Sequence, residues 1–142
     1  MLKKVAVVAV GVAGFSLVLA LTTSSARAHH AFAAEFDAHK PVTFDHAVVT
    51  KMEWTNPHAW IYIDAKMPDG TVEKWAIEAG TPNVLLRRGL TREALKPGTE
   101  IKVDGYREKD GSARANGRNL TLPNGQMLFL GSSGIGAPVE KP

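Results

Sequence analysis

The chain has 142 residues, with 17 Lys and Arg against 14 Asp and Glu, a formal charge of +3 at pH 7. This length predicts one domain. Without residues 1–28, which carry three of the basic residues, 14 basic residues balance 14 acidic ones. A near-neutral chain lacks the basic footprint of a nucleic-acid-binding protein, so we expect no nucleic-acid partner. The absence of cysteine excludes disulfides, thiol catalysis and cysteine-based zinc sites.

Residues 1–28 have the three parts of a secretory signal peptide. Lys3 and Lys4 are followed by an apolar run and then by a polar stretch ending in Ala26-Arg27-Ala28, an A-x-A cleavage signal. We therefore expect a periplasmic protein with no membrane insertion after the leader is cleaved. Cleavage after Ala26 is also acceptable. The alternative is an uncleaved anchor, because the apolar run is nearly long enough to span a bilayer.

Cleavage after Ala28 would leave His29 as the new amino terminus, followed by His30. The free amine and the ring nitrogen of one histidine form a chelate, and one further imidazole gives a three-nitrogen site that suits copper(II). After cleavage at Ala26, His29 would be third from the terminus, a position that also binds copper or nickel. The alternative is an ordinary terminus with two solvated histidines.

We interpret residues 29–40 as an N-terminal arm. Phe32 and Phe36 are four residues apart and would share a helical face, but the arm is equally compatible with an extended segment whose two rings enter the core. Pro41 ends any helix, because the residue before a proline avoids helical geometry.

The pattern of residues 41–130 predicts strands joined by tight turns. A phase change at Asp45-His46 predicts a bulge in the first strand, and Gly70 a hairpin turn. Thr81 and Pro82 start a short helix as N-cap and first residue. The expected strands are 42–54, 60–65, 71–78, 101–106, 113–122 and 126–130.

This order predicts a mostly β protein, a small OB-fold-like Greek-key β-barrel with one short helix between strands three and four. The domain would span residues 41–130, followed by a disordered Gly/Ser/Pro-rich tail at 131–142. The side chains expected to fill the barrel are Trp54, Trp60, Trp75, Leu85, Val103 and Leu120. Those expected on the outer face of the fifth strand are Arg114, Asn116 and Arg118.

The segment Trp54-Thr55-Asn56-Pro57-His58-Ala59-Trp60 connects the first two strands and carries the main functional clue. We expect a metal-binding protein, with copper(II) as first choice and zinc as second. The candidate ligands are His29, His30 and His58. The candidate second-shell groups or alternative ligands are Asp37, Glu78 and His46. The residues expected to shape the loop, shield it or contact a ligand or partner are Trp54, Asn56 and Trp60.

Three alternatives stay open. In a structural interpretation, His58 satisfies a buried carbonyl at the barrel edge. In a second, the protein is a binding module without metal, which contacts an anionic ligand or the periplasmic part of a membrane protein; the cations expected to receive this partner are Arg87, Arg88, Arg114 and Arg118. An enzyme is the least favoured class, since Ser112 and Ser132 lack a nucleophile elbow.

Several motifs together resemble a known family. They are His29-His30 after the leader, Phe36-Asp37, Trp54-x-Asn56-Pro57-His58, Trp75-x-x-Glu78, Lys96-Pro97-Gly98 and Asn124-Gly125. Over about residues 29–130 the chain resembles the bacterial domain-of-unknown-function family 6152. The resemblance implies a small, secreted, single-domain protein of β-barrel type. It implies no established activity, cofactor or catalytic residue.

Overall fold

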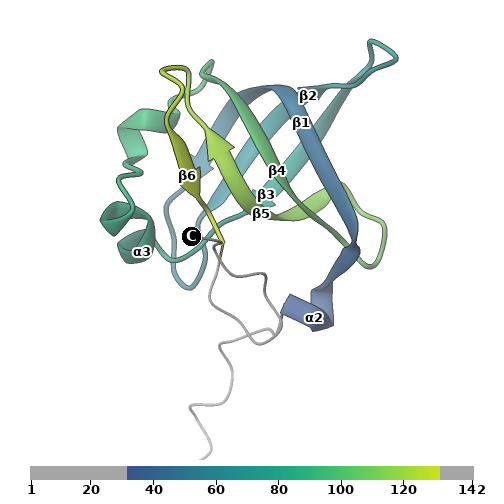
Figure 1. The fold of residues 1–142 in the computed structure, drawn as a ribbon, viewed down its shortest axis with the longest axis horizontal. Helices are drawn as coiled ribbons and strands as arrows, with labels where there is room; N and C mark the ends of the chain where they lie inside the picture. Colours follow the sequence, from purple (N-terminus) through teal and green to yellow (C-terminus); the bar gives the residue numbers. More distant parts are fainter. Residues whose placement is uncertain (1–31, 132–142) are drawn as a thin grey trace, which may run out of the picture.

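The computed structural model describes residues 32–131, which form short helices and six strands (Figure 1). In chain order the elements are α2 (Phe32–Glu35), β1 (Phe36–Glu53), β2 (Trp60–Lys66), β3 (Val72–Glu78), α3 (Pro82–Arg87), the 3₁₀ helix η1 (Arg92–Leu95), β4 (Glu100–Glu108), β5 (Arg114–Thr121) and β6 (Met127–Phe129). The predicted leader, His29 and His30 lie outside the described residues, as does the predicted tail from residue 132 on. Among the described residues, no helix has the length and apolar character required to cross a membrane.

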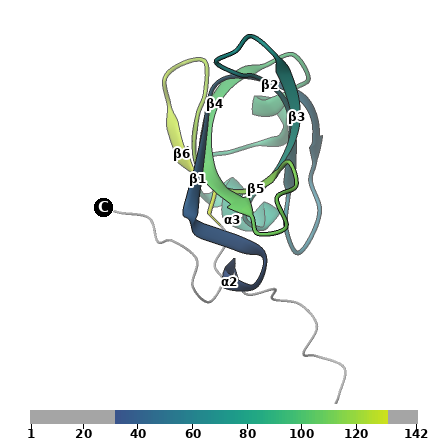
Figure 2. The same cartoon turned by 90° about the vertical axis from the view of Figure 1, so that its right-hand side faces the viewer.

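The six strands form one mostly antiparallel sheet in the order β3-β2-β1-β4-β5-β6. An additional parallel pairing joins β3 to β5, so the hydrogen bonding returns to its starting strand and runs in a ring. Figure 2 shows the strands surrounding a common axis. Strand β6 pairs with the C-terminal part of β5, outside this ring. The predicted class, mostly β with a short helix after the third strand, is confirmed.

Strand β1, with 18 residues, is the longest of the described strands, and its two parts pair with different neighbours. Its N-terminal part pairs with β4 and its C-terminal part with β2. The register with β4 shifts between Phe44 and Ala47, which confirms the predicted bulge at Asp45-His46. The strand begins at Phe36 rather than Val42. Residues 37–41 lack an alternating apolar pattern, and pairing with β4 makes them extended instead.

The β2–β3 hairpin and the helix after it follow their sequence signals. Gly70 has a φ of 86°, which the tight turn requires. The side-chain oxygen of Thr81 accepts a hydrogen bond from the backbone N–H of Val84 at 3.4 Å, and Pro82 is the first helical residue. Leu85 in α3 is fully buried in the core.

Most of the predicted core residues are buried inside the ring, with Trp75, Val103 and Leu120 each 4% exposed or less. Trp54 is half-buried against this core. The prediction for Trp60 was wrong. Ile61 next to it is fully buried and points inward. Because side chains alternate along a strand, Trp60 points outward.

Candidate functional site

Four neighbouring strands contribute paired residues that form one row across the outer face of the ring. Trp60 on β2 pairs with Glu78 on β3, which pairs with Asn116 on β5, which pairs with Tyr106 on β4. Directly paired residues on adjacent strands point to the same face of a sheet. Their chain neighbours, such as Ile61, are buried in the core.

Helix α2 lies beside this row, at the lower end of the molecule in Figures 1 and 2. The ring of Phe32 packs against Tyr106 with centroids 5.7 Å apart, and against Phe36 at 5.8 Å. The Lys109 backbone N–H donates to the Glu35 carbonyl at 2.8 Å, and its side chain to the Ala33 carbonyl at 2.5 Å. Both conformations predicted for the arm therefore occur in its described part. Residues 32–35 form a helical turn, and the residues from Phe36 on are extended.

Two members of the row are polar and nevertheless buried. Glu78 is 6% exposed and Asn116 is 3% exposed. The sequence predicted that Asn116 faces outward, and this agrees with the structure. Its burial was not predicted.

The carboxylate of Glu78 accepts a hydrogen bond from the Asn116 side-chain amide at 3.2 Å. Burial, together with the negative charge of Glu35, raises the pKa of Glu78 from 4.5 to about 7. The hydrogen bond from Asn116 and the positive charge of Arg114 oppose this rise of the pKa. A carboxyl group with a pKa near neutrality, held by a specific amide, is typical of a functional site.

His58 meets Glu78 at the end of the β1–β2 loop. Its Nδ1 lies 3.3 Å from the carbonyl oxygen of Ala79 and 3.8 Å from Oε1 of Glu78. The Ala79 carbonyl can only accept a hydrogen bond, so it favours a proton on Nδ1 and leaves the lone pair on Nε2. The loop is shaped by a cis Asn56-Pro57 bond. With Nδ1 facing these two groups, Nε2 of His58 is the ring nitrogen that can bind an ion or accept a proton.

Arg114 occupies the neighbouring part of the outer face. Its guanidinium lies 4.7 Å from the centre of the Trp60 ring and 3.3 Å from the carboxylate of Glu108. The Ser112 hydroxyl donates to the same carboxylate at 2.8 Å. Arg88 donates to the carbonyls of Phe129 and Gly131. Two of the four arginines expected to receive an anionic partner thus have partners within the fold.

The remaining predicted site residues lie in other surroundings. Asn56 is exposed in the loop, and Trp54 is half-buried. The Asp37 carboxylate accepts from the backbone N–H of His39 at 2.9 Å. His46 interacts with Glu100 through Nδ1 at 2.9 Å. The structure therefore brings His58 and Glu78 together, and it assigns different immediate partners to Asp37 and His46.

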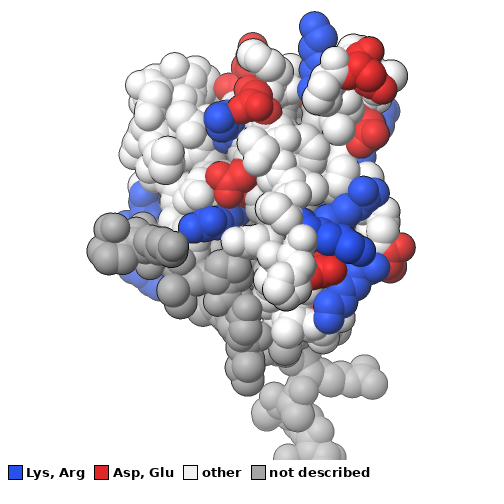
Figure 3. All heavy atoms as spheres, turned by 45° about the vertical axis from the view of Figure 1, so that its right-hand side comes forward, with Lys and Arg blue, Asp and Glu red and all other residues white. Residues whose placement is uncertain are grey.

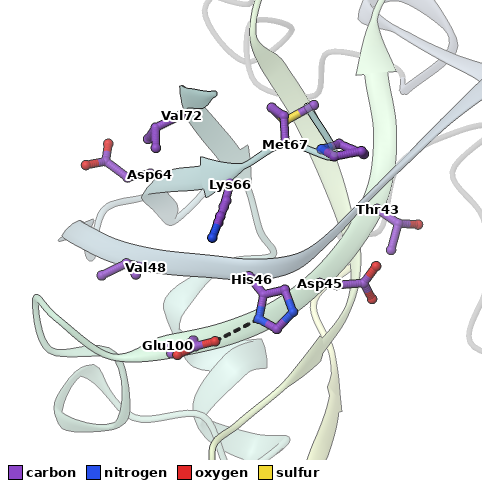
Figure 4. Close-up of a pocket in the computed structure, with 10 residues that line it drawn as sticks. Thr43, Asp45, His46, Val48, Asp64, Lys66, Met67, Val72 and Glu100 are labelled. Carbon is purple, nitrogen blue, oxygen red and sulfur yellow. Dashed lines mark hydrogen bonds and ion pairs between the residues drawn. The ribbon is translucent and has the colours of Figure 1, made fainter. Parts of the chain in front are cut away.

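An open groove lies where β1 bends away from β2, with a volume of about 1160 Å³ (Figure 4). The bulge turns both Asp45 and His46 to this groove. Val72, at its edge, is 63% exposed. The complete lining consists of Thr43, Asp45, His46, Val48, Asp64, Lys66, Met67, Pro68, Val72 and Glu100.

On the face shown in Figure 3, acidic and basic side chains are interspersed, as a near-neutral chain predicts.

Within residues 32–131, no three His, Asp or Glu side chains come close enough to hold a metal ion together. The predicted set of His29, His30 and His58 includes two residues outside this range, so it stays a prediction. Sequence reasoning missed Asn116 as a site residue. The sequence carries no local signal for this residue, because its position opposite Glu78 depends on the register of the parallel β3–β5 pairing.

The sequence model of a family of unknown function (DUF6152) matches residues 17–118, well over half of the chain. No curated protein and no solved structure matches the chain. The family match confirms the resemblance carried by the motifs, and it includes both His58 and Glu78.

Proposed function

The chain belongs to the DUF6152 family, whose function is unknown, and we propose that it is an exported protein that binds copper(II), with zinc as second choice. The proposed ligands are His29, His30 and His58. Glu78 acts behind His58 as the group that orients its ring. The fold proposed for the ring is an OB-fold barrel, which the pairing order β1-β2-β3-β5-β4 and the position of α3 between β3 and β4 support.

The observation that carries this proposal is the environment of the His58 ring. A histidine that binds a metal through one nitrogen almost always donates its other N–H to a carboxylate or a backbone carbonyl. His58 has both kinds of acceptor beside Nδ1, the Ala79 carbonyl at 3.3 Å and the Glu78 carboxylate at 3.8 Å. Its side chain is 17% exposed, which supports access for an ion.

The position of α2 supports the contribution of the N-terminal histidines. Phe32 contacts Tyr106, and Tyr106 pairs with Asn116, whose amide binds Glu78. His30 precedes Phe32 by two residues, which is at most about 7 Å of extended chain. Phe32, the first described residue after the histidine pair, therefore lies beside the row that contains Glu78, the neighbour of His58.

The decisive experiment is a copper(II) titration of protein that is expressed with its own leader and isolated from the periplasm after cleavage of that leader. Intact mass should place the amino terminus at His29. We expect one copper ion per chain with a dissociation constant below about 1 μM, which corresponds to roughly −8 kcal/mol. His58→Ala should weaken binding at least about tenfold, because one of the imidazole ligands is lost.

His46→Ala is the matched control, since His46 is exposed and has its own carboxylate partner, Glu100. It should leave the affinity unchanged. Binding that is weak and equal in the parent and in His58→Ala would refute the metal site. The contact between His58 and Ala79 would then have only the structural role of satisfying a carbonyl.

A second candidate function is a binding module without metal, which the open groove supports (Figure 4). Asp64 and Lys66 line this groove, as does Val48, which is 40% exposed. The proposed partner is a periplasmic protein, including the exposed part of a membrane protein. Cross-linking in the periplasm that chelators do not affect, and that Lys66→Glu abolishes, would favour this function over metal binding.

A further inference from the structure

We infer that Asn116 is a positioning residue for His58. Its amide fixes the Glu78 carboxylate so that the imidazole stays in the tautomer with Nε2 available to an ion. The inference deepens the proposed function and rests on it for the role of copper, but the tautomer is a property of the metal-free protein as well.

One carboxylate oxygen connects the two residues. Oε1 of Glu78 accepts from Nδ2 of Asn116 at 3.2 Å, and the same Oε1 lies 3.8 Å from Nδ1 of His58. When Glu78 is ionised, Oε1 is an acceptor only and favours a proton on Nδ1. If the carboxyl group turned away, the preference would decrease, and the Ala79 carbonyl at 3.3 Å would be left as the other acceptor.

Asn116 is well suited to this role because it is held on a strand and not on a loop. It lies directly opposite Glu78 in the parallel β3–β5 pairing that closes the ring. The side chain is 3% exposed, so water does not readily replace its amide. Gly105, on the other side, has no side chain and approaches the Asn116 backbone closely. Strand β5 therefore holds Asn116 at a fixed distance from β3.

The same strand offers a matched control. Asn119 also donates its side-chain amide to a carboxylate across the sheet, that of Asp104, at 3.2 Å to one oxygen. Asp104 is partly exposed. No hydrogen bond connects this second pair to His58 among the described residues. Asn119→Leu thus removes an amide–carboxylate pair of the same kind from the same strand, without the connection to the imidazole.

The test is ¹⁵N NMR of histidine-labelled mature protein at pH 8, where Glu78 is mostly ionised. Spectra are recorded for the parent, Asn116→Leu, Asn116→Ser and Asn119→Leu. The parent should show His58 with the proton on Nδ1. Both Asn116 variants should shift the two ring nitrogens of His58 towards the averaged values of a tautomer mixture, while Asn119→Leu should not. Asn116→Ser retains a small polar side chain and decides the question if the leucine variant does not fold.

Copper titration of the same samples gives the second readout. The Asn116 variants should bind copper(II) about tenfold more weakly than the parent, the usual effect of removing an outer partner of a ligand. Unchanged His58 nitrogen shifts in a folded Asn116 variant would overturn the inference. If the parent binds no copper but the shifts change as expected, the positioning role stands and the proposed function fails.

Discussion

The ring of Phe32 packs edge-on against Tyr106, with centroids 5.7 Å apart and planes at 88°. This contact joins the first described helix to strand β4, far along the chain. Tyr106 is the cross-strand neighbour of Asn116, so the contact also fixes the N-terminal segment beside the buried polar pair. Substitution of Phe32 therefore tests whether this contact holds the arm in place.

Removal of the Phe32 ring should release the arm. Phe32 is 4% exposed, and truncation of a buried phenylalanine costs about 3 kcal/mol or somewhat more. We expect Phe32→Ala to lower the free energy of unfolding in urea by about this amount and to weaken copper binding. Leu86→Ala is the control, because Leu86 is 49% exposed, and it should change stability by less than about 0.5 kcal/mol. Equal stabilities would show that the arm does not contribute to the fold.

Glu78 should make the protein less stable as the pH rises towards neutrality. Its pKa is about 7 in the folded state against 4.5 for an ordinary Glu, so in this interval the folded state holds a proton that the unfolded state has lost. By linkage, stability then falls from about pH 4.5 to about pH 7, by up to about 3 kcal/mol, and is level above that pH.

Urea unfolding at a series of pH values checks this prediction. Glu78→Gln cannot ionise, so the part of the decline due to this residue should vanish, and the variant should be more stable than the parent at pH 8. Glu93→Gln, in the exposed turn of η1, should retain the decline of the parent. A parent curve that rises between pH 5 and 7, together with an identical curve for Glu78→Gln, contradicts the assignment.

Most of the fold was predicted from two sequence signals. They are the alternation of apolar residues in strands two and three, and the turn residues. Those signals are local, and local signals also predicted α3 from Thr81 and Pro82. The site was predicted only in part. His58 stood out because it lies in an unusual loop, whereas the position of Asn116 opposite Glu78 depends on the pairing of β3 with β5, which no local pattern predicts. Trp60 was predicted to fill the barrel, but the alternation of side chains along β2 places Ile61 inside and Trp60 outside.

Arg114 should contribute modestly to stability through Trp60 and Glu108. Its side chain is 43% exposed, so solvent weakens the ion pair, while the stacking at 4.7 Å remains. We expect Arg114→Met to lower the free energy of unfolding by about 1 kcal/mol. Arg87→Met, at the exposed end of α3, is the control and should have no measurable effect. A neutral result for both would mean that the Trp60 contact contributes nothing in solution.

Gly105 should not tolerate even one additional carbon atom. A Cβ at this position would lie 2.1 Å from the backbone oxygen of Asn116 and 3.1 Å from Cα of Gly117. Backbone atoms of a paired strand cannot rotate away, so β4 and β5 would have to separate. We expect Gly105→Ala to lower the free energy of unfolding by about 3 kcal/mol or more. Any folded fraction should show altered His58 nitrogen shifts, because Asn116 moves with β5.

Gly98→Ala is the control. Its new Cβ meets no atom within 4 Å, but φ is 91°, so backbone strain of about 1 kcal/mol is expected. Thermal unfolding of the two variants separates these effects, and a Gly105→Ala protein as stable as Gly98→Ala would refute the close approach of the two strands.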